Sequence, residues 1–322
     1  MPKGRLSTSA RPDFRRPRTS SFTLQRFILI VDARIQQSVV ANLSGRPAPI
    51  TVGPFVIGVD PGTDSPGINY ATPIPGSPIT ATDVTALIAA FRSAKRKPRL
   101  EYVTSTAPDL EALLLGAGFT VEERHEYLIC TPATLTVPPT PDGFELLAPS
   151  TDEQRIAMVS AQHAAFGGDT AATTADATRM ARLQSRGGIA LMAVATADAA
   201  TTSSGFTGSD GSGSLGAGSD GAGSLGDARM TVGGSNMDVF AVAGGGQAVP
   251  PSDGVSEVAG IAVREAYRRR GLAGAITADI TSRLFAAGAE LAWLEASGVE
   301  SWRVYERIGY RPAGKRLYIA ME

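Results

Sequence analysis

The chain has 322 residues, of which 43% are hydrophobic, and a formal net charge of −1. This length allows two domains, and the near-neutral charge gives no global case for nucleic acid or an anionic membrane surface. One cysteine, Cys130, excludes an intrachain disulfide, and two histidines are too few for a zinc cluster. No apolar run approaches about 18 residues, so we expect no membrane span. Taken together, these features lead us to expect a soluble, cytoplasmic protein without a metal or a nucleic-acid partner.

The first 26 residues are strongly basic. They contain seven Lys or Arg against one acid, Asp13, and Ser, Thr and Pro fill the gaps. An organelle transit peptide has a similar composition, but the prolines at 2, 12 and 17 weaken the amphipathic helix that it needs. Residues 1–26 are therefore predicted to be a disordered tail.

A first folded block is predicted over residues 27–137. Its clearest element is a helix at 81–95, for which Thr80 and Asp83 form a capping-box pattern. A shorter helix is predicted at 110–115, where Gly116 and Gly118 end it. Strands are predicted from apolar runs at 27–31, 50–59, 68–71, 100–104 and 119–131.

A second block is predicted over residues 143–322. The segment 208–217 is nearly repeated as 218–227, and such Gly/Ser-rich sequence buries too little surface to fold. We interpret 198–236 as a flexible insertion within this block. Helices are predicted at 152–165, 171–185, 272–287 and 299–308, and strands at 144–147, 188–195, 237–243, 256–263, 291–295 and 310–321.

The stretch from Val258 to Gly274 has the pattern of a phosphate-binding turn. An apolar strand ending at Val263 leads into three arginines, and a helical pattern then begins at Leu272. The first turn of a helix has N–H groups without intrahelical partners, and the helix dipole favours an anion there. The small residues at 271, 273 and 274 allow a pyrophosphate to approach the backbone.

The two blocks contain an internal repeat. Residues 100–128 align with 291–319 at a constant offset of 191, so that Tyr102 matches Trp293 and Gly118 matches Gly309. The helix at 81–95 matches the later helix at the same offset. The first copy has Pro75-Gly-Ser-Pro-Ile where the arginine turn is expected and Leu114 in the position of Tyr305, which indicates a scaffold without the functional residues.

The second block resembles the GNAT superfamily of acyl-CoA-dependent N-acetyltransferases. The family signature, Gln/Arg-x-x-Gly-x-Gly/Ala after a strand, matches Arg268–Ala273, and Tyr305 to Tyr310 match its terminal Tyr-x-x-x-Gly-Tyr/Phe element. The resemblance implies an α/β (α+β) protein with tandem GNAT-like folds, a mixed central sheet and flanking helices. The first block is then a degenerate relative, and the second is the catalytic domain.

The resemblance also implies roles for individual residues. Glu257 occupies the position of a general base that deprotonates the amine, and Tyr305 that of an acid that protonates the departing thiolate. Each has an alternative: a solvated glutamate before a buried strand, or a packed helix tyrosine. The binding site for acetyl-CoA is predicted to consist of Ile261, Ala262, Val263, Arg268, Arg269, Arg270, Gly271, Leu272, Ala273 and Gly274.

The expected reaction is transfer of an acetyl group from acetyl-CoA to a primary amine, on either a small molecule or a peptide. The rival is a non-catalytic acyl-CoA-binding or interaction protein. The family's Asn near 296–301 is absent, which puts one cofactor contact in doubt, and Glu295 is either a strand-end charge or a substrate contact. His163 is interpreted as a helix residue near the acceptor cleft. The acceptor itself carries no recognisable code.

Overall fold

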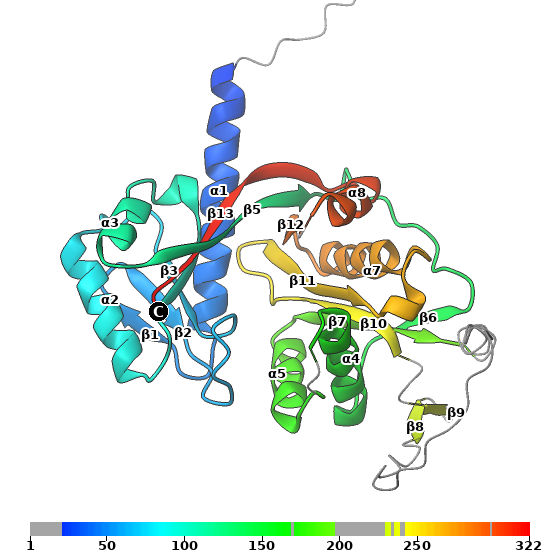
Figure 1. The fold of residues 1–322 in the computed structure, drawn as a ribbon. Helices are drawn as coiled ribbons and strands as arrows, with labels where there is room; N and C mark the ends of the chain where they lie inside the picture. Colours follow the sequence, from blue (N-terminus) through cyan, green and yellow to red (C-terminus); the bar gives the residue numbers. More distant parts are fainter. Residues whose placement is uncertain (1–20, 169–170, 197–228, 233–234, 239–241, 297) are drawn as a thin grey trace, which may run out of the picture.

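The computed structural model describes residues 21–168, 171–196, 229–232, 235–238, 242–296 and 298–322. Most strands join one eleven-stranded sheet in the order β1-β2-β3-β4-β13-β5-β12-β11-β10-β7-β6 (Figure 1). The first copy contributes β1 (Ile50–Val52), β2 (Phe55–Gly58), β3 (Tyr70–Pro73), β4 (Arg99–Val103) and β5 (Thr120–Cys130). The second contributes β6 (Phe144–Leu147), β7 (Ile189–Ala195), β10 (Val242–Ala248), β11 (Val255–Val263), β12 (Leu291–Glu295) and β13 (Arg311–Ala320).

The two copies exchange their last strands at the centre of the sheet. The final strand of the second copy, β13, pairs antiparallel with β4 of the first, with Leu317 opposite Tyr102. The final strand of the first copy, β5, pairs in the same way with β12 of the second, with Ile129 opposite Trp293. The two exchanged strands also pair with each other. Each copy therefore completes its part of the sheet with a strand from the other copy.

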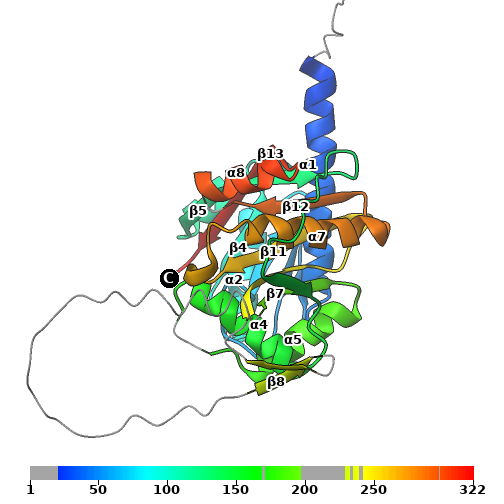
Figure 2. The same cartoon turned by 90° about the vertical axis from the view of Figure 1, so that its right-hand side faces the viewer.

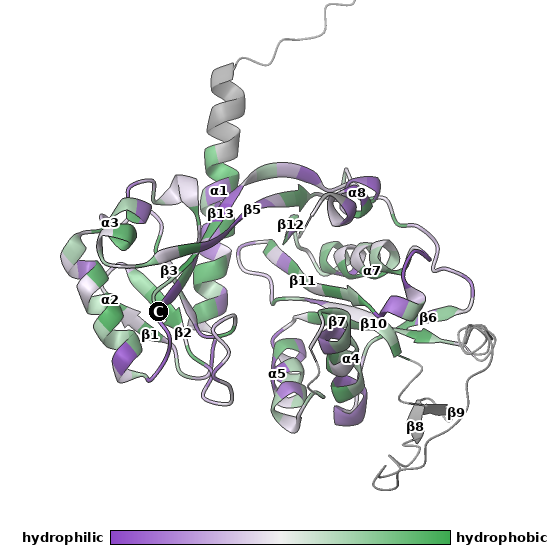
Figure 3. Cartoon of the chain, viewed as in Figure 1, coloured by the Kyte–Doolittle hydropathy of each residue, from purple (hydrophilic) through white to green (hydrophobic). Residues whose placement is uncertain are grey.

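Helices cover both faces of this sheet (Figures 1 and 2). One face of the second copy packs on α7 (Leu272–Ala286) with α8 (Val299–Arg307), and the other on α4 (Asp152–Ala165) and α5 (Thr174–Ser185). In the first copy, α2 (Ala81–Ser93) and α3 (Leu110–Gly116) each pack one apolar face against the sheet. In Figure 3, hydrophilic residues lie along much of β5 and β13, the two strands that link the copies.

The first helix, α1 (Ser21–Ser44), joins the two copies on the face opposite α2 and α3. Its buried residues Val31, Ile35, Val39 and Leu43 recur every four residues, as expected for one helical face. They pack against a cluster that includes Tyr70 of the first copy and residues of β11 and β12 in the second. The helix therefore stabilises the contact between the copies.

Several predicted elements need correction. The strand predicted at 27–31 is wrong, because this apolar run is part of α1, which begins within the predicted tail. The single strand at 50–59 is a hairpin that turns at Gly53, whose φ is +51°. Residues 1–20 of the tail and 197–228 of the insertion lie outside the described residues. The end of the insertion contains a two-stranded sheet, β8 (Arg229–Val232) with β9 (Ser235–Asp238), where a flexible loop was predicted.

Most of the remaining predicted elements are confirmed within a few residues. The capping box at the start of α2 is also confirmed: the Asp83 amide donates to Thr80 Oγ1 at 3.3 Å, and the Thr80 amide donates to Asp83 Oδ2 at 2.8 Å. Among the described residues, no helix is both long and apolar enough to cross a membrane. The described residues also contain no group of three or more His, Cys, Asp or Glu side chains that could hold a metal ion.

Candidate active site

The strands β11 and β12 separate along half of their length. They pair in parallel only from Val255 opposite Leu291 to Glu257 opposite Trp293. Beyond Glu257, β11 continues to Val263 and pairs on its other side with β10. On the side that faces β12, the backbone N–H and C=O groups of residues 258–263 therefore have no strand partner. Because buried backbone groups need hydrogen-bond partners, a ligand can pair with them here.

A bulge at Gly260 directs this open edge. The register between β10 and β11 shifts at this point, and Gly260 has a φ of +63°, which a residue with a Cβ rarely adopts. Gln162 of α4 fixes the bulge, because its Nε2 donates to the Gly260 carbonyl at 2.7 Å and to Gln247 Oε1 at 2.7 Å. The position of the edge is therefore determined by side chains from outside the strand.

The turn after β11 forms an anion site at the start of α7. Gly271 is the N-cap residue, with a φ of +85°, and no side chain caps the helix. Arg269 also lies in the left-handed region, with a φ of +61°. Within the described residues, none of the amides from Arg269 to Gly274 donates to a protein acceptor. Several N–H groups are thus free to bind an anion, and the helix dipole favours one there.

The three arginines of this turn have different environments. Arg268 donates from Nε to the Val263 carbonyl at 3.1 Å and from Nη2 to the Ala165 carbonyl at 2.8 Å, which ties the turn to the end of α4. Arg270 lies over the rings of Phe144 and Tyr267, at 5.8 and 5.9 Å from their centroids. Arg269 is exposed. The side chain of Arg268 thus shapes the turn, while Arg269 remains available to a bound anion.

Glu257 occupies the last position of β11 that pairs with β12, and it lines a cavity of about 460 Å³. Burial raises the pKa of its carboxyl to about 7; Arg316 and Arg46 oppose this rise, whereas Glu295 and Glu101 add to it. A carboxyl group that titrates near neutral pH is suited to exchange protons with a substrate. The cavity is also lined by Ala259 and Gly260, so it reaches the part of β11 that does not pair with β12.

A buried charge network lies beside Glu257. Arg316 of β13 donates from Nη1 to Glu295 Oε1 at 2.7 Å and from Nη2 to Glu101 Oε2 at 3.4 Å. Tyr318 donates to Glu295, and Arg99 to Glu101. Burial would favour a lower pKa for the Arg316 guanidinium, but the surrounding carboxylates hold it well above its ordinary range. Glu295 is therefore an internal ion-pair partner in this structure.

Tyr305 lies on a different side of the site. It is 7% exposed and packs at 6.3 Å between ring centroids from Tyr310, in the core beneath α7. Burial raises the pKa of its hydroxyl to about 12, so the group is protonated at neutral pH. Its hydroxyl has no hydrogen-bond partner among the described residues, and Tyr305 does not line the cavity of Glu257. The two predicted catalytic residues therefore do not line the same cavity.

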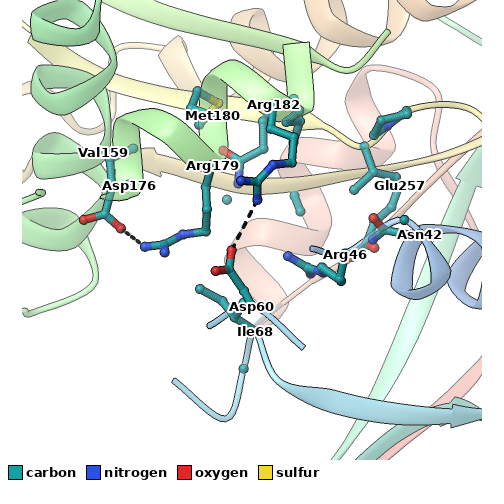
Figure 4. Close-up of a pocket in the computed structure, with 18 of the residues that line it drawn as sticks. Asn42, Arg46, Asp60, Ile68, Val159, Asp176, Arg179, Met180, Arg182 and Glu257 are labelled. Carbon is teal, nitrogen blue, oxygen red and sulfur yellow. Dashed lines mark hydrogen bonds and ion pairs between the residues drawn. The ribbon is translucent and has the colours of Figure 1, made fainter. Parts of the chain in front are cut away.

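The cavity itself lies between the two copies (Figure 4). The second copy contributes residues of α4, α5, β10 and β11; His163, which lies in α4 as predicted, is one of them. The first copy contributes the end of α1, the loop after β2 and buried parts of β3 and β4. Sequence reasoning missed the residues of the first copy, among them Asn42, Arg46, Asp60, Ile68, Tyr70 and Glu101.

The equivalent opening in the first copy is closed. Strands β3 and β4 pair only at Ala71 opposite Leu100. Gln36 of α1 fills the space beyond: its Nε2 donates to the Pro73 carbonyl at 2.7 Å, and its Oε1 accepts from the Val103 amide at 2.9 Å. The position that matches Tyr305 is the buried Leu114. The first copy therefore has neither an open strand edge nor the tyrosine.

The comparisons with known proteins agree with this architecture. The family model described as FR47-like protein matches residues 250–319, which include β11, the arginine turn and α7. A GCN5-related N-acetyltransferase from Kribbella flavida has a TM-score of 0.63 and 22% identity, over 90% of this chain and 95% of that one. A comparison with curated sequences gives no match.

Two further solved structures are similar over nearly the whole chain. A tandem GNAT protein from the clavulanic acid biosynthesis pathway has a TM-score of 0.55 and 13% identity, over 94% of this chain and 96% of that one. A GCN5-related N-acetyltransferase from Sphaerobacter thermophilus has a TM-score of 0.51 and 14% identity, over 91% and 93%. The predicted resemblance and fold class are therefore confirmed.

Proposed function

We propose that this chain, a tandem protein with the fold of the GCN5-related N-acetyltransferases, transfers an acetyl group from acetyl-CoA to a primary amine. One observation carries the proposal. A single strand, β11, has its open edge between an uncapped helix N-terminus at Gly271 and a carboxyl of raised pKa at Glu257. This is the order in which an acyl-CoA would meet an amine: pyrophosphate, pantetheine arm, thioester, acceptor.

The residues that would bind acetyl-CoA follow from this geometry. The amides of residues 269–274 and the exposed guanidinium of Arg269 would bind the pyrophosphate. The backbone of Ile261 to Val263 would pair with the amide groups of the pantetheine arm, as an added strand does. Bound acetyl-CoA supplies a thioester whose carbonyl carbon is the electrophile.

Glu257 and Tyr305 would then transfer protons on either side of the reaction. Glu257 accepts a proton from the acceptor ammonium, directly or through water, because an amine with a pKa near 10.4 is largely protonated at neutral pH. As the C–N bond forms and the C–S bond breaks, the Tyr305 hydroxyl donates a proton to the leaving sulfur, and the acylated nitrogen gives up its second proton, which restores the Tyr305 hydroxyl. The products are an N-acetyl amide and a free thiol, and Glu257 releases the proton it accepted to solvent.

The test combines thiol release with identification of the product. The protein is mixed with acetyl-CoA and a pool of small amines and amino acids, released thiol is followed with a chromogenic reagent, and acetylated products are identified by mass spectrometry. We expect amine-dependent thiol release over many turnovers and at least one N-acetylated amine. Tight binding of acetyl-CoA without thiol release from any acceptor would instead favour a non-catalytic acyl-CoA-binding protein.

A further inference from the structure

The cavity between the copies has an uneven distribution of charge. Its lining includes the carboxyl groups of Glu257 and the buried Glu101, together with the buried Tyr70. Four arginines also line it, one from the first copy and three from α5 and the residue after it: Arg46, Arg179, Arg182 and Arg186. A ligand that spans this cavity therefore meets negative charge at one point and positive charge at another.

Three of these four arginines already have partners. Arg179 pairs with Asp176 of the same helix. Arg182 lies 3.7 Å from Asp60 of the first copy (Figure 4), and Arg186 donates to the Gly45 carbonyl at 2.5 Å. These last two contacts hold the end of α5 against the first copy. The charge of Arg179 is paired within α5, although its Nη1 is buried without a hydrogen-bond acceptor.

Arg46 differs from the other three. Among the described residues it has no ion-pair partner, and its Nε is buried without a hydrogen-bond acceptor. A buried donor without an acceptor costs free energy, so a position of this kind is suited to a bound anion. Glu101 is not an ion-pair partner of Arg46, because its carboxylate is already bound by Arg99 and Arg316. Arg46 thus remains available to a ligand.

Glu257 and Arg46 both line this cavity (Figure 4). The charge of Arg46 is near enough to lower the pKa of Glu257, yet the two side chains form no ion pair with each other. A ligand bound in the cavity can therefore meet one cation and one anion that are not paired with each other. A plain cationic amine would meet Glu257 favourably but would also be repelled by Arg46.

We propose that the acceptor is a zwitterionic amine whose anionic group binds Arg46 while its amine faces Glu257. The proposal rests on the proposed function and identifies the substrate class of that site. The planar guanidinium group can bind either a carboxylate or a phosphate through two parallel hydrogen bonds, so an amino acid and an amino phosphate share the required chemistry. A volume of about 460 Å³ fits a small molecule of this kind.

The experiment measures kcat/KM for matched acceptors that differ only in the anionic group. The pairs are L-lysine with cadaverine, L-phenylalanine with phenethylamine, and phosphoethanolamine with ethanolamine. For at least one pair, we expect the zwitterion to exceed its partner by about 10-fold or more, since charge-assisted hydrogen bonds are lost in the partner. Whether an amino acid or phosphoethanolamine shows the larger preference distinguishes carboxylate from phosphate.

Variants of Arg46 then locate the preference. Arg46→Met should lower kcat/KM for the preferred zwitterion about 100-fold and change that for the partner without the anionic group less than about 3-fold. Arg46→Lys should restore part of the loss. Arg92→Met, on the exposed surface of α2, is the matched control and should alter neither value. Thermal unfolding confirms that each variant is folded.

Two results would overturn the inference, and they differ from a failure of the proposed function. Equal kcat/KM for both members of every pair would show that no anionic group is recognised. An equal loss for both members in Arg46→Met, with the acid limb of the pH profile shifted to higher pH, would show that Arg46 acts only on Glu257. The absence of thiol release from any acceptor, with acetyl-CoA still bound, would instead contradict the proposed function itself.

Discussion

Glu257 is the residue whose ionisation should control the rate. Its pKa of about 7 means that the basic form increases as the pH rises from 6 to 8. We therefore expect kcat/KM to rise with an inflection near pH 7 and then to stay level, because the Tyr305 hydroxyl remains protonated until about pH 12. Glu257→Gln should lower kcat/KM roughly 10²–10⁴-fold, the usual contribution of a general base.

In that variant, the remaining activity should rise only towards the pKa of the free amine, near 10.4 for a lysine-like acceptor. An unchanged inflection near pH 7 in Glu257→Gln would show that another group is responsible for it. Full activity in the variant would remove Glu257 from the mechanism.

The same raised pKa makes a prediction about stability. Glu257 binds its proton more tightly in the folded protein, with a pKa of about 7, than in the unfolded chain, whose value is near the ordinary 4.5. Its contribution to stability is therefore fully present below about pH 4.5 and is lost as the pH rises through 7. Relative to the wild type, Glu257→Gln should become more stable by about 2 kcal/mol between pH 5 and pH 8, as measured by urea unfolding. No change with pH would contradict a raised pKa.

Tyr305 and Tyr310 provide a matched pair of hydroxyl deletions. The hydroxyl of Tyr305 has no partner among the described residues, whereas that of Tyr310 forms a 2.6 Å hydrogen bond with Thr281. Tyr305→Phe should therefore lower kcat by roughly 10²-fold or more with little loss of stability. Tyr310→Phe should reduce stability by about 1 kcal/mol and leave kcat nearly unchanged. The opposite result would assign Tyr305 to packing alone.

At the residue scale, the sequence could predict the residues near the motifs but not those that the fold brings in. Glu257, Tyr305 and the turn at 268–274 lie within one recognisable pattern. Arg46 and Glu101 belong to the other copy, more than 150 positions away, and Arg316 reaches Glu101 only because β13 pairs with β4. A pattern confined to one copy contains no information about contacts of this kind.

At the element scale, the turn before α7 is expected to bind an anion through its backbone. Arg269 is exposed and has a φ of +61°, a conformation that Asn and Asp tolerate better than most residues. Arg269→Asp should leave the fold intact, yet raise the Kd for CoA about 10-fold or more, because it places a like charge beside the pyrophosphate.

Arg269→Asn serves as the control for this charge effect, since it removes the cation without adding an anion. Its Kd, measured by calorimetry, should lie between the wild-type and Arg269→Asp values. Identical affinity in all three proteins would place the pyrophosphate elsewhere.

Gln36 is the side chain that closes the strand opening of the first copy. It bonds the Val103 amide and the Pro73 carbonyl, and in Gln36→Leu both groups would be buried without partners. We expect this variant to lose about 1–3 kcal/mol of unfolding free energy. Gln37→Leu, one residue further along α1 and exposed, should change it by less than about 0.5 kcal/mol. Equal effects in the two variants would mean that Gln36 does not seal the strands.

Periodicity and capping patterns predicted most elements because burial follows them closely. The exceptions have physical causes. The run from Phe27 to Val31 has the composition of a strand, but Ile35, Val39 and Leu43 continue it at helical spacing, and a longer window would have indicated α1. The hairpin at 50–58 was missed because Gly53-Pro54 lies inside an otherwise apolar run.

At the scale of the whole molecule, the two copies that the internal repeat predicts differ in the opening between their central strands. The constant offset of 191 residues predicted the equivalence of β4 with β12 and of β5 with β13. It could not predict that β5 and β13 are exchanged, because either arrangement satisfies the same local pattern. The exchange joins the copies into one sheet and brings Arg46 and Glu101 of the first copy to the cavity of the second.

The central claim is that one copy has an open acyl-CoA site and the other has a closed one. Isothermal titration calorimetry of the full chain with acetyl-CoA tests it most directly. We expect one binding site per chain, whose affinity falls in Arg269→Asp and stays unchanged in Gln37→Leu. Two sites per chain would show that the first copy is open despite Gln36, and the absence of binding would contradict an acyl-CoA site in this protein.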